Sequence, residues 1–213
     1  MKKKIAPLLL VCIAMSMVLV GCMKIVKIGE EDRLTGETEF NAGDNVVEFW
    51  ESEALPELQR EAVDLSAFLL EAKGDLKSLA EEHGTFSMGS SGELSYTVKG
   101  SGIVEKVDTA SKAGFMVIKL DGYSGDEEVK IQIGTVIKGS SVRDSLSFIK
   151  FGNYTNQQDF AAVSQSINSL IMKDVIDPDT AKEMEGKNIT FLGCFTASDN
   201  ATILITPVEI EVE

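Results

Sequence analysis

The chain has 213 residues, which is enough for one ordinary domain with an appendage but too few for two full domains. Its 44% hydrophobic and 25% charged residues are typical of a globular protein, so the composition excludes wholesale disorder and a protein with several membrane spans. The formal net charge of -14 repels phosphate backbones and anionic headgroups, so we expect no nucleic-acid partner.

Residues 1–21 have the layout of a secretion signal. Three lysines at positions 2 to 4 precede an apolar run, 5–20, that is shorter than the roughly 20 residues of a membrane-spanning helix. The run ends at Leu19-Val20-Gly21-Cys22, which resembles the lipobox of bacterial lipoproteins. We therefore expect removal of residues 1–21 and attachment of diacylglycerol to Cys22. An uncleaved membrane anchor is the alternative.

The lipid predicted on Cys22 determines where the protein is expected. Each buried methylene contributes about 0.8 kcal/mol, so two or more acyl chains make the attachment to a membrane effectively permanent. Met23 stands where an aspartate would signal retention in the inner membrane. We expect the periplasmic face of the outer membrane if the organism has two membranes, and the outer leaflet of the plasma membrane if it has one.

Residues 22–53 are polar and mixed, and they are predicted to form a lipid-anchored tether with a hydrophobic docking point near its end. Trp50, the only tryptophan, lies at that point. Core or docking use of Trp50 is the simpler interpretation, and a platform for a ligand is the alternative.

The segment 54–84 is predicted to be one amphipathic helix. Pro56 suits its first turn, and His83 followed by Gly84 suits its end, while Gly74 is a point where it can kink or restart. Two uses are open for its apolar stripe: packing on the protein's own sheet, or a coiled-coil contact with another chain. The stripe has a strict spacing of three and four residues, at positions 55, 58, 62, 65, 69, 72, 76 and 79.

The rest of the chain, 94–213, is rich in predicted strands. Gly100 and Gly102 interrupt the first strand, as in a strongly bent strand with a bulge. Three strands, a helix and two further strands predict an α+β fold: an OB-like five-stranded barrel with a helix between strands 3 and 4, preceded by the long amphipathic helix. We expect 54–213 to form one folded unit. The predicted strands are 95–107, 115–120, 129–137, 188–196 and 201–212.

The helix between the third and fourth strands is predicted to open at a capping box. Thr155 and Gln158 have the required spacing of three residues. Asp177-Pro178 then starts a short helical turn that Gly186 ends.

Catalytic and metal-binding patterns are scarce. His83 is the only histidine, and once the leader and the lipid site are set aside Cys194 is the only thiol, so no intramolecular disulfide can form. Sites that need several histidines are excluded, and acidic runs such as 126–128 lack the spacing of a calcium loop. We therefore expect no metal, no cofactor and no enzymatic activity.

Polar side chains gather between the third strand and the following helix. An arginine with neighbouring amides, as at Arg143, is suited to fixing a carboxylate, a sugar hydroxyl or a partner's backbone. The alternative is structural: Arg143 pairs with Asp144, and the amides satisfy loop backbone groups. The candidate binding residues are Lys138, Arg143, Asp144, Asn156 and Gln157, together with Trp50.

Short motifs occur in a characteristic order along nearly the whole mature chain: Phe40-Asn41-Ala42, Val47, Trp50, Leu55-Pro56, Val98-Lys99-Gly100-Ser101-Gly102, the run from Ile133 to Gly139, Val142-Arg143-Asp144, Asn156-Gln157, Gly186-Lys187 and Ile205-Thr206-Pro207-Val208. Together they resemble a family of predicted periplasmic lipoproteins of unknown function. The resemblance implies gene neighbours that encode ribose-type sugar ABC transporters. Thr135 and Lys138 replace an expected proline and arginine, so the resemblance assigns no role to these side chains.

The leading hypothesis for function is a non-enzymatic accessory lipoprotein that binds a protein partner or a small solute and is associated with a sugar ABC transport system. The expected partner is a transporter component or a solute-binding protein. A structural envelope-interaction protein that uses the helix stripe is the alternative, followed by an uncharacterised enzyme.

Overall fold

The computed structural model describes residues 42–198 and 202–213, which lie within one folded unit, Asn41–Glu213. The predicted signal, Cys22 and the tether before residue 42 lie outside the described residues. Across the two described ranges, no helix is both long and apolar enough to cross a membrane.

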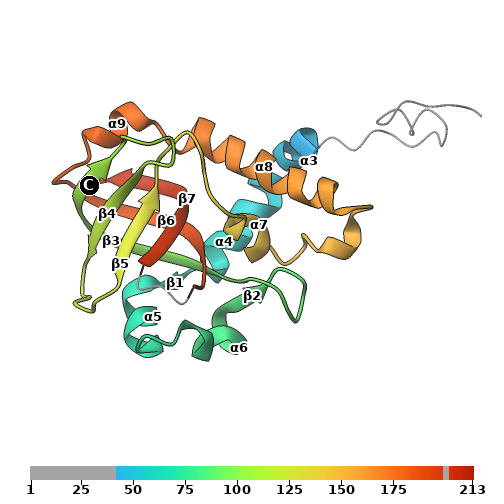
Figure 1. The fold of residues 1–213 in the computed structure, drawn as a ribbon, viewed down its shortest axis with the longest axis horizontal. Coiled ribbons are helices and arrows are strands. Elements are labelled where there is room, and N and C mark those ends of the chain that lie inside the picture. The colour runs from blue at the N-terminus through green and yellow to red at the C-terminus, as the bar shows by residue number, and fades with distance from the viewer. Residues whose placement is uncertain (1–41, 199–201) are drawn as a thin grey trace, which may run out of the picture. The chain divides into compact units, whose positions relative to one another are not determined.

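Five strands form a closed ring (Figure 1). Their order is β3-β4-β5-β7-β6, and β6 pairs back onto β3. β5 and β7 are parallel, and the other neighbouring pairs in the ring are antiparallel. The prediction of an α+β, OB-like fold is confirmed. The strands are β3 (Leu94–Asp108), β4 (Phe115–Leu120), β5 (Glu128–Gln132), β6 (Asn188–Thr196) and β7 (Thr202–Val212).

β3 closes the ring because one half pairs with β6 and the other half with β4. The change occurs around Gly102, which faces Ile189 on one side and Leu120 on the other. A Cβ atom at Gly102 would lie 2.3 Å from the backbone oxygen of Lys119, so a side chain here would push the two strands apart. The predicted bend of this strand therefore depends on Gly102.

The third ring strand is shorter than predicted, because it ends at Gln132 and not at residue 137. The Gln132 side chain binds the backbone of the loop that follows. Its Oε1 accepts from the Lys138 N–H at 2.8 Å, and its Nε2 donates to the Lys138 carbonyl at 3.1 Å. The chain from 133 onward thus folds back on the end of β5.

The N-terminal segment departs from the prediction of a tether. Residues 42–54 are helical, as α3 (Ala42–Phe49) and a π-helical turn, Trp50–Ala54. Trp50 is 5% exposed and belongs to the hydrophobic core, which agrees with its simpler interpretation. The tether prediction is wrong for this part because Ala42, Val46, Trp50 and Ala54 are buried in the hydrophobic core.

The prediction of one helix over 54–84 is also wrong. Ala62 adopts an extended conformation, and the next two residues pair in parallel with Val98 and Lys99 of β3. The Asp64 side chain then caps the following helix by accepting from the Ala67 N–H at 2.9 Å. The elements are α4 (Leu55–Glu61), β1 (Val63–Asp64), α5 (Leu65–Ala72), a 3-10 turn (Leu76–Leu79), α6 (Ala80–His83) and β2 (Gly84–Phe86).

The apolar stripe of this segment nevertheless packs on the protein's own sheet. Leu58, Leu65 and Leu69 are at most 2% exposed. The Phe68 ring lies 4.7 Å from that of Tyr96 on β3, between ring centroids. Burial of these leucines favours packing within the protein over a coiled-coil contact with another chain.

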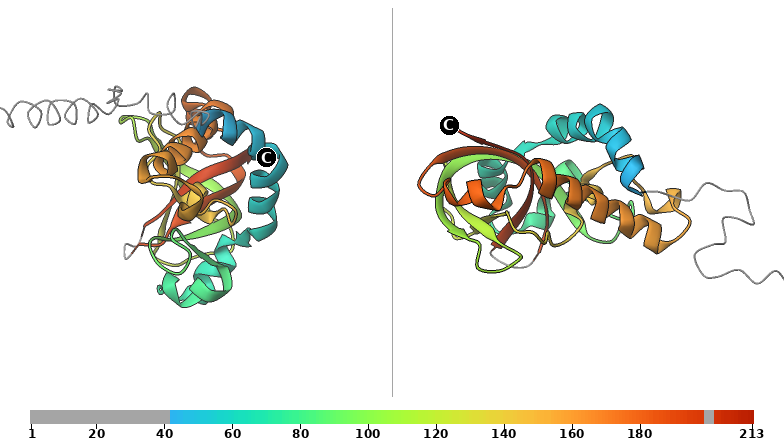
Figure 2. Two further views of the ribbon diagram at one scale, coloured as in Figure 1. Left: turned by 90° about the vertical axis from the view of Figure 1, so that its right-hand side faces the viewer. Right: turned by 90° about the horizontal axis from the view of Figure 1, so that it is seen from above.

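The expected helix between the third and fourth ring strands is α8 (Gln157–Asp174), preceded by α7 (Ser141–Ser145) and a 3-10 turn (Phe151–Asn153) and followed by α9 (Pro178–Lys182). Its cap lies one residue later than predicted: Asn156 Oδ1 accepts from the Asp159 N–H at 2.9 Å. α8 packs along α3 and extends away from the ring (Figure 2).

Candidate functional site

Arg143 and Asp144 form a buried structural pair. Arg143 Nε and Nη2 donate to one Asp144 carboxylate oxygen at 2.8 and 2.6 Å, and the Asp144 side chain has no exposed surface. Ser140 Oγ donates to the other oxygen at 2.6 Å. Arg143 Nη1 donates to the Phe160 carbonyl, and the guanidinium lies 3.7 Å from the Phe160 ring centroid. This geometry agrees with the structural interpretation of the pair and not with a binding role. The arginine connects α7 to α8.

The other candidate residues do not converge with this pair into one site. Asn156 is exposed and caps α8, and Gln157 and Lys138 are exposed. Trp50 is in the core. The candidate constellation is therefore spread over a buried ion pair, a helix cap and separate surface positions.

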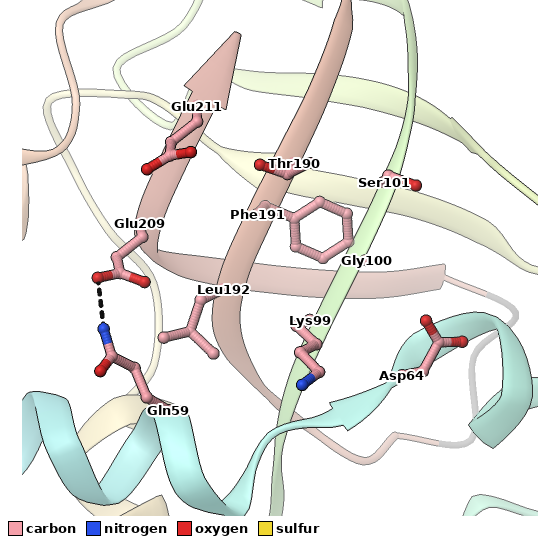
Figure 3. A pocket seen from close by; sticks show the side chains of 10 residues that line it. All are labelled: Gln59, Asp64, Lys99, Gly100, Ser101, Thr190, Phe191, Leu192, Glu209 and Glu211. Carbon is pink, nitrogen blue, oxygen red and sulfur yellow. Dashed lines mark hydrogen bonds between the residues drawn. The ribbon is translucent and has the colours of Figure 1, made fainter. Parts of the chain in front are cut away.

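A different set of residues lines a hollow of about 510 Å³ on the outer face of the ring (Figure 3). Its floor is formed by β3, β6 and β7, and its wall by α4 and β1. Strand alternation turns every second side chain outward, toward the hollow. The lining residues are Gln59, Asp64, Lys99, Gly100, Ser101, Thr190, Phe191, Leu192, Glu209 and Glu211.

The strand register arranges the floor in two rows. Lys99 pairs with Leu192, which pairs with Glu209. Ser101 pairs with Thr190, which pairs with Glu211. The ammonium therefore belongs to the β3 side of the hollow, and the two glutamates belong to the β7 side.

Several lining groups already have partners within the protein. Gln59 Nε2 donates to Glu209 Oε1 at 2.8 Å, which joins the helical wall to the floor (Figure 3). The Asp64 carboxylate is engaged by the helix cap, and Ser101 Oγ donates to Asp121 at 2.7 Å. Over 42–198 and 202–213, no ion pair involves Lys99.

This hollow was not found by sequence reasoning. Lys99 and Ser101 stand in the motif Val98-Lys99-Gly100-Ser101-Gly102, and Glu209 and Glu211 alternate with apolar residues, which predicts that they face outward. Nothing in the sequence showed that these two segments share one face, because the pairing of β6 with both β3 and β7 brings them together.

The remaining reactive groups lie elsewhere. Cys194 is fully buried, and burial raises the pKa of its thiol to about 11, so it remains protonated and unreactive at neutral pH. His83 ends α6, 3.8 Å from the Glu82 carboxylate. In the part of the chain that the structure describes, no group of three or more histidine, cysteine, aspartate or glutamate side chains is placed to hold a metal ion.

Fold and site together define an OB-type protein with a polar hollow on the outside of its ring. The chain is similar to the crystal structure of an OB-fold protein from Thermotoga maritima, with a TM-score of 0.64 and 15% sequence identity over 83% of this chain and 100% of that one. This likeness concerns the fold. The comparison with curated proteins found no match.

The family of the chain is shown by a match over residues 12–211 to the family described as "Predicted periplasmic lipoprotein (DUF2291)". The protein belongs to this family, as the sequence motifs indicated. Membership supports a location in the cell envelope.

Proposed function

We propose that the protein is a non-enzymatic accessory lipoprotein that binds a small hydroxyl-bearing solute in the hollow and serves a sugar ABC transport system. The observation that carries the proposal is the convergence of polar side chains from α4, β1, β3, β6 and β7 on one hollow of about 510 Å³. This volume lies within the range of small-molecule sites.

The chemistry of the lining suits hydroxyl groups. Carboxylates accept hydrogen bonds, ammonium groups donate them, and amides and hydroxyls do both, as a sugar hydroxyl does. Leu192 stands between Lys99 and Glu209 in the strand register, so the two charged groups are held apart. The hollow can therefore fix several hydroxyls at once.

The proposed setting is the membrane surface. A lipid on Cys22 would hold the hollow beside the membrane, on the periplasmic face of the outer membrane or on the outer leaflet of a single membrane. A transporter component or a solute-binding protein is then the partner within reach. The alternative of an envelope contact through the helix stripe loses support, since Leu58, Leu65 and Leu69 are buried.

The test is calorimetric titration of the detergent-purified mature protein with ribose and glucose. We expect saturable binding that Lys99→Met weakens. Lys119→Met is the matched control, because Lys119 is an exposed lysine on β4 outside the hollow. If neither ribose nor glucose binds, or if both variants lose the same amount of binding affinity, a sugar site in the hollow is contradicted. Co-purification of transporter components with crosslinked protein tests the association with transport.

A further inference from the structure

The hollow has a separation of charge that its own residues do not neutralise. Lys99 and Glu209 stand in one row, with Leu192 between them, so their backbones are two strand spacings apart, about 10 Å. Glu209 accepts from Gln59 and does not pair with Lys99. The β7 side, with its two carboxylates, is thus the acceptor side of the hollow. The β3 side has the Lys99 ammonium, and the register partner of Lys99 on β1, Asp64, is already engaged by a helix cap.

The acceptor side carries the larger charge. Glu209 and Glu211 are two residues apart on one face of β7, about 7 Å along the strand. Within the described ranges, the Glu211 side chain has no hydrogen bond or ion pair, and the Glu209 side chain has only the neutral amide of Gln59. One small cation between these carboxylates would contact both, and no lysine or arginine among the lining residues of the hollow lies on that side.

From this we infer that the solute of the hollow is an amino sugar, whose ammonium lies between Glu209 and Glu211 and whose hydroxyls face Lys99, Ser101 and Thr190. The inference rests on the proposed function, since it specifies the hydroxyl-bearing solute of that same hollow. An ammonium both donates to the two carboxylates and is attracted by their charge, so it adds more than another neutral hydroxyl would.

The two charged sides also fix the orientation of the ligand. The Lys99 ammonium repels the ligand's amine and donates to its hydroxyl oxygens. An acidic sugar would meet Asp64, Glu209 and Glu211 against the single cation of Lys99, so it would be repelled by most of the lining.

The experiment compares glucosamine, glucose and glucuronate as probes of the detergent-purified mature protein, at a mildly acidic pH that keeps the amine protonated. We expect glucosamine to bind up to about fivefold more tightly than glucose, which is the effect of one partly exposed ion pair, and glucuronate to bind most weakly. The preference should fall as salt is added.

Glu211→Gln should lower the preference for glucosamine over glucose, because the amide can still hydrogen-bond to hydroxyls but has lost the charge that attracts the ammonium. The Glu211 side chain is exposed and has no hydrogen bond or ion pair within the described ranges, so its substitution leaves the fold intact, which a thermal melt verifies. Glu105→Gln is the matched control, since Glu105 is exposed on β3 outside the hollow. Equal binding of glucose and glucosamine, or tightest binding of glucuronate, overturns the inference and leaves the proposed function standing. Failure of all three sugars to bind overturns the proposed function itself.

Discussion

Arg143 is fixed in place by a complete set of partners. Its guanidinium contacts the Asp144 carboxylate, the Phe160 carbonyl and the Phe160 ring, and its side chain is 10% exposed. A buried ion pair contributes little compared with apolar residues of the same size, but removing one partner leaves an uncompensated charge. The role of Arg143 is therefore architectural, and its loss should affect stability.

Replacing Arg143 by alanine leaves the Asp144 carboxylate without its positively charged partner. This side chain has no exposed surface and would retain only Ser140 as a side-chain hydrogen-bond donor. We expect a loss of about 3–5 kcal/mol in the free energy of unfolding, measured by denaturant titration. Adding Asp144→Asn should recover part of it. Lys138→Ala, at an exposed side chain, serves as the control. An unchanged stability for Arg143→Ala would show that the carboxylate is solvated and the pair is not structural.

Asn156 and Gln157 were grouped by the sequence, and the structure gives them different surroundings. Asn156 caps α8 through the Asp159 N–H, whereas the Gln157 side chain is exposed at the first helical position. Asn156→Ala should lower the free energy of unfolding by about 1 kcal/mol, and Gln157→Ala should leave it nearly unchanged. Thermal melts of the two variants decide this. Equal melting temperatures would contradict a capping role.

At the scale of elements, the ring depends on β3, which changes partner in mid-strand. Gly100 lies opposite Phe191, and Gly102 lies where β3 exchanges β6 for β4. A Cβ at Gly100 would meet the Phe191 ring at 2.9 Å, a side chain that can move, but a Cβ at Gly102 would meet the Lys119 backbone oxygen at 2.3 Å. The two glycines therefore differ in how much the surrounding structure can yield.

Gly102→Ala should destabilise the protein by about 1–3 kcal/mol, as overpacking typically does, because the obstacle is paired backbone. Gly100→Ala should cost clearly less. Denaturant midpoints of the two variants, determined side by side, are the measurement. The reverse order would mean that β3 and β4 separate more easily than the Phe191 ring moves.

Contacts between elements also explain why the predicted helix over 54–84 is interrupted. The spacing of its apolar residues fits a continuous helix, but Val63 and Asp64 form strand bonds with β3, and the Asp64 side chain starts the next helix. Backbone pairing with a strand already in place outweighs the weak helical preference of two residues. The apolar stripe survives the break, because each short helix still presents its leucines to the ring.

At the scale of the whole molecule, the predicted lipid site, Cys22, lies outside the described residues. The family to which the chain belongs is one of predicted periplasmic lipoproteins, and its match begins at residue 12, ahead of Cys22. We expect Cys22→Ser to leave an unlipidated precursor, because the substituted hydroxyl cannot take the place of the thiol that receives the lipid. Mass spectrometry of the amino terminus shows whether the lipid is attached. Cys194→Ala is the control for loss of a thiol. An unmodified Cys22 in the wild type would contradict the lipoprotein proposal.

Part of this protein could be predicted from sequence alone, because the signals concerned are local. Strand alternation repeats every two residues, and the order of three strands, a helix and two strands indicates the OB-like ring. The strands β4 (Phe115–Leu120) and β6 (Asn188–Thr196) have the predicted bounds. Such features need no knowledge of distant neighbours.

The tertiary structure alone decided the rest, since it depends on which distant segments meet. Two residues of β1 break a regular helical pattern by pairing with β3, and residues 42–54, which were predicted to form a tether, are helical. The hollow exists because β6 pairs with β3 on one edge and β7 on the other, which places Lys99 and Glu209 in one row. Residues 110 positions apart carry no mutual signal in a single sequence, so the position of the site is a property of strand register and ring closure.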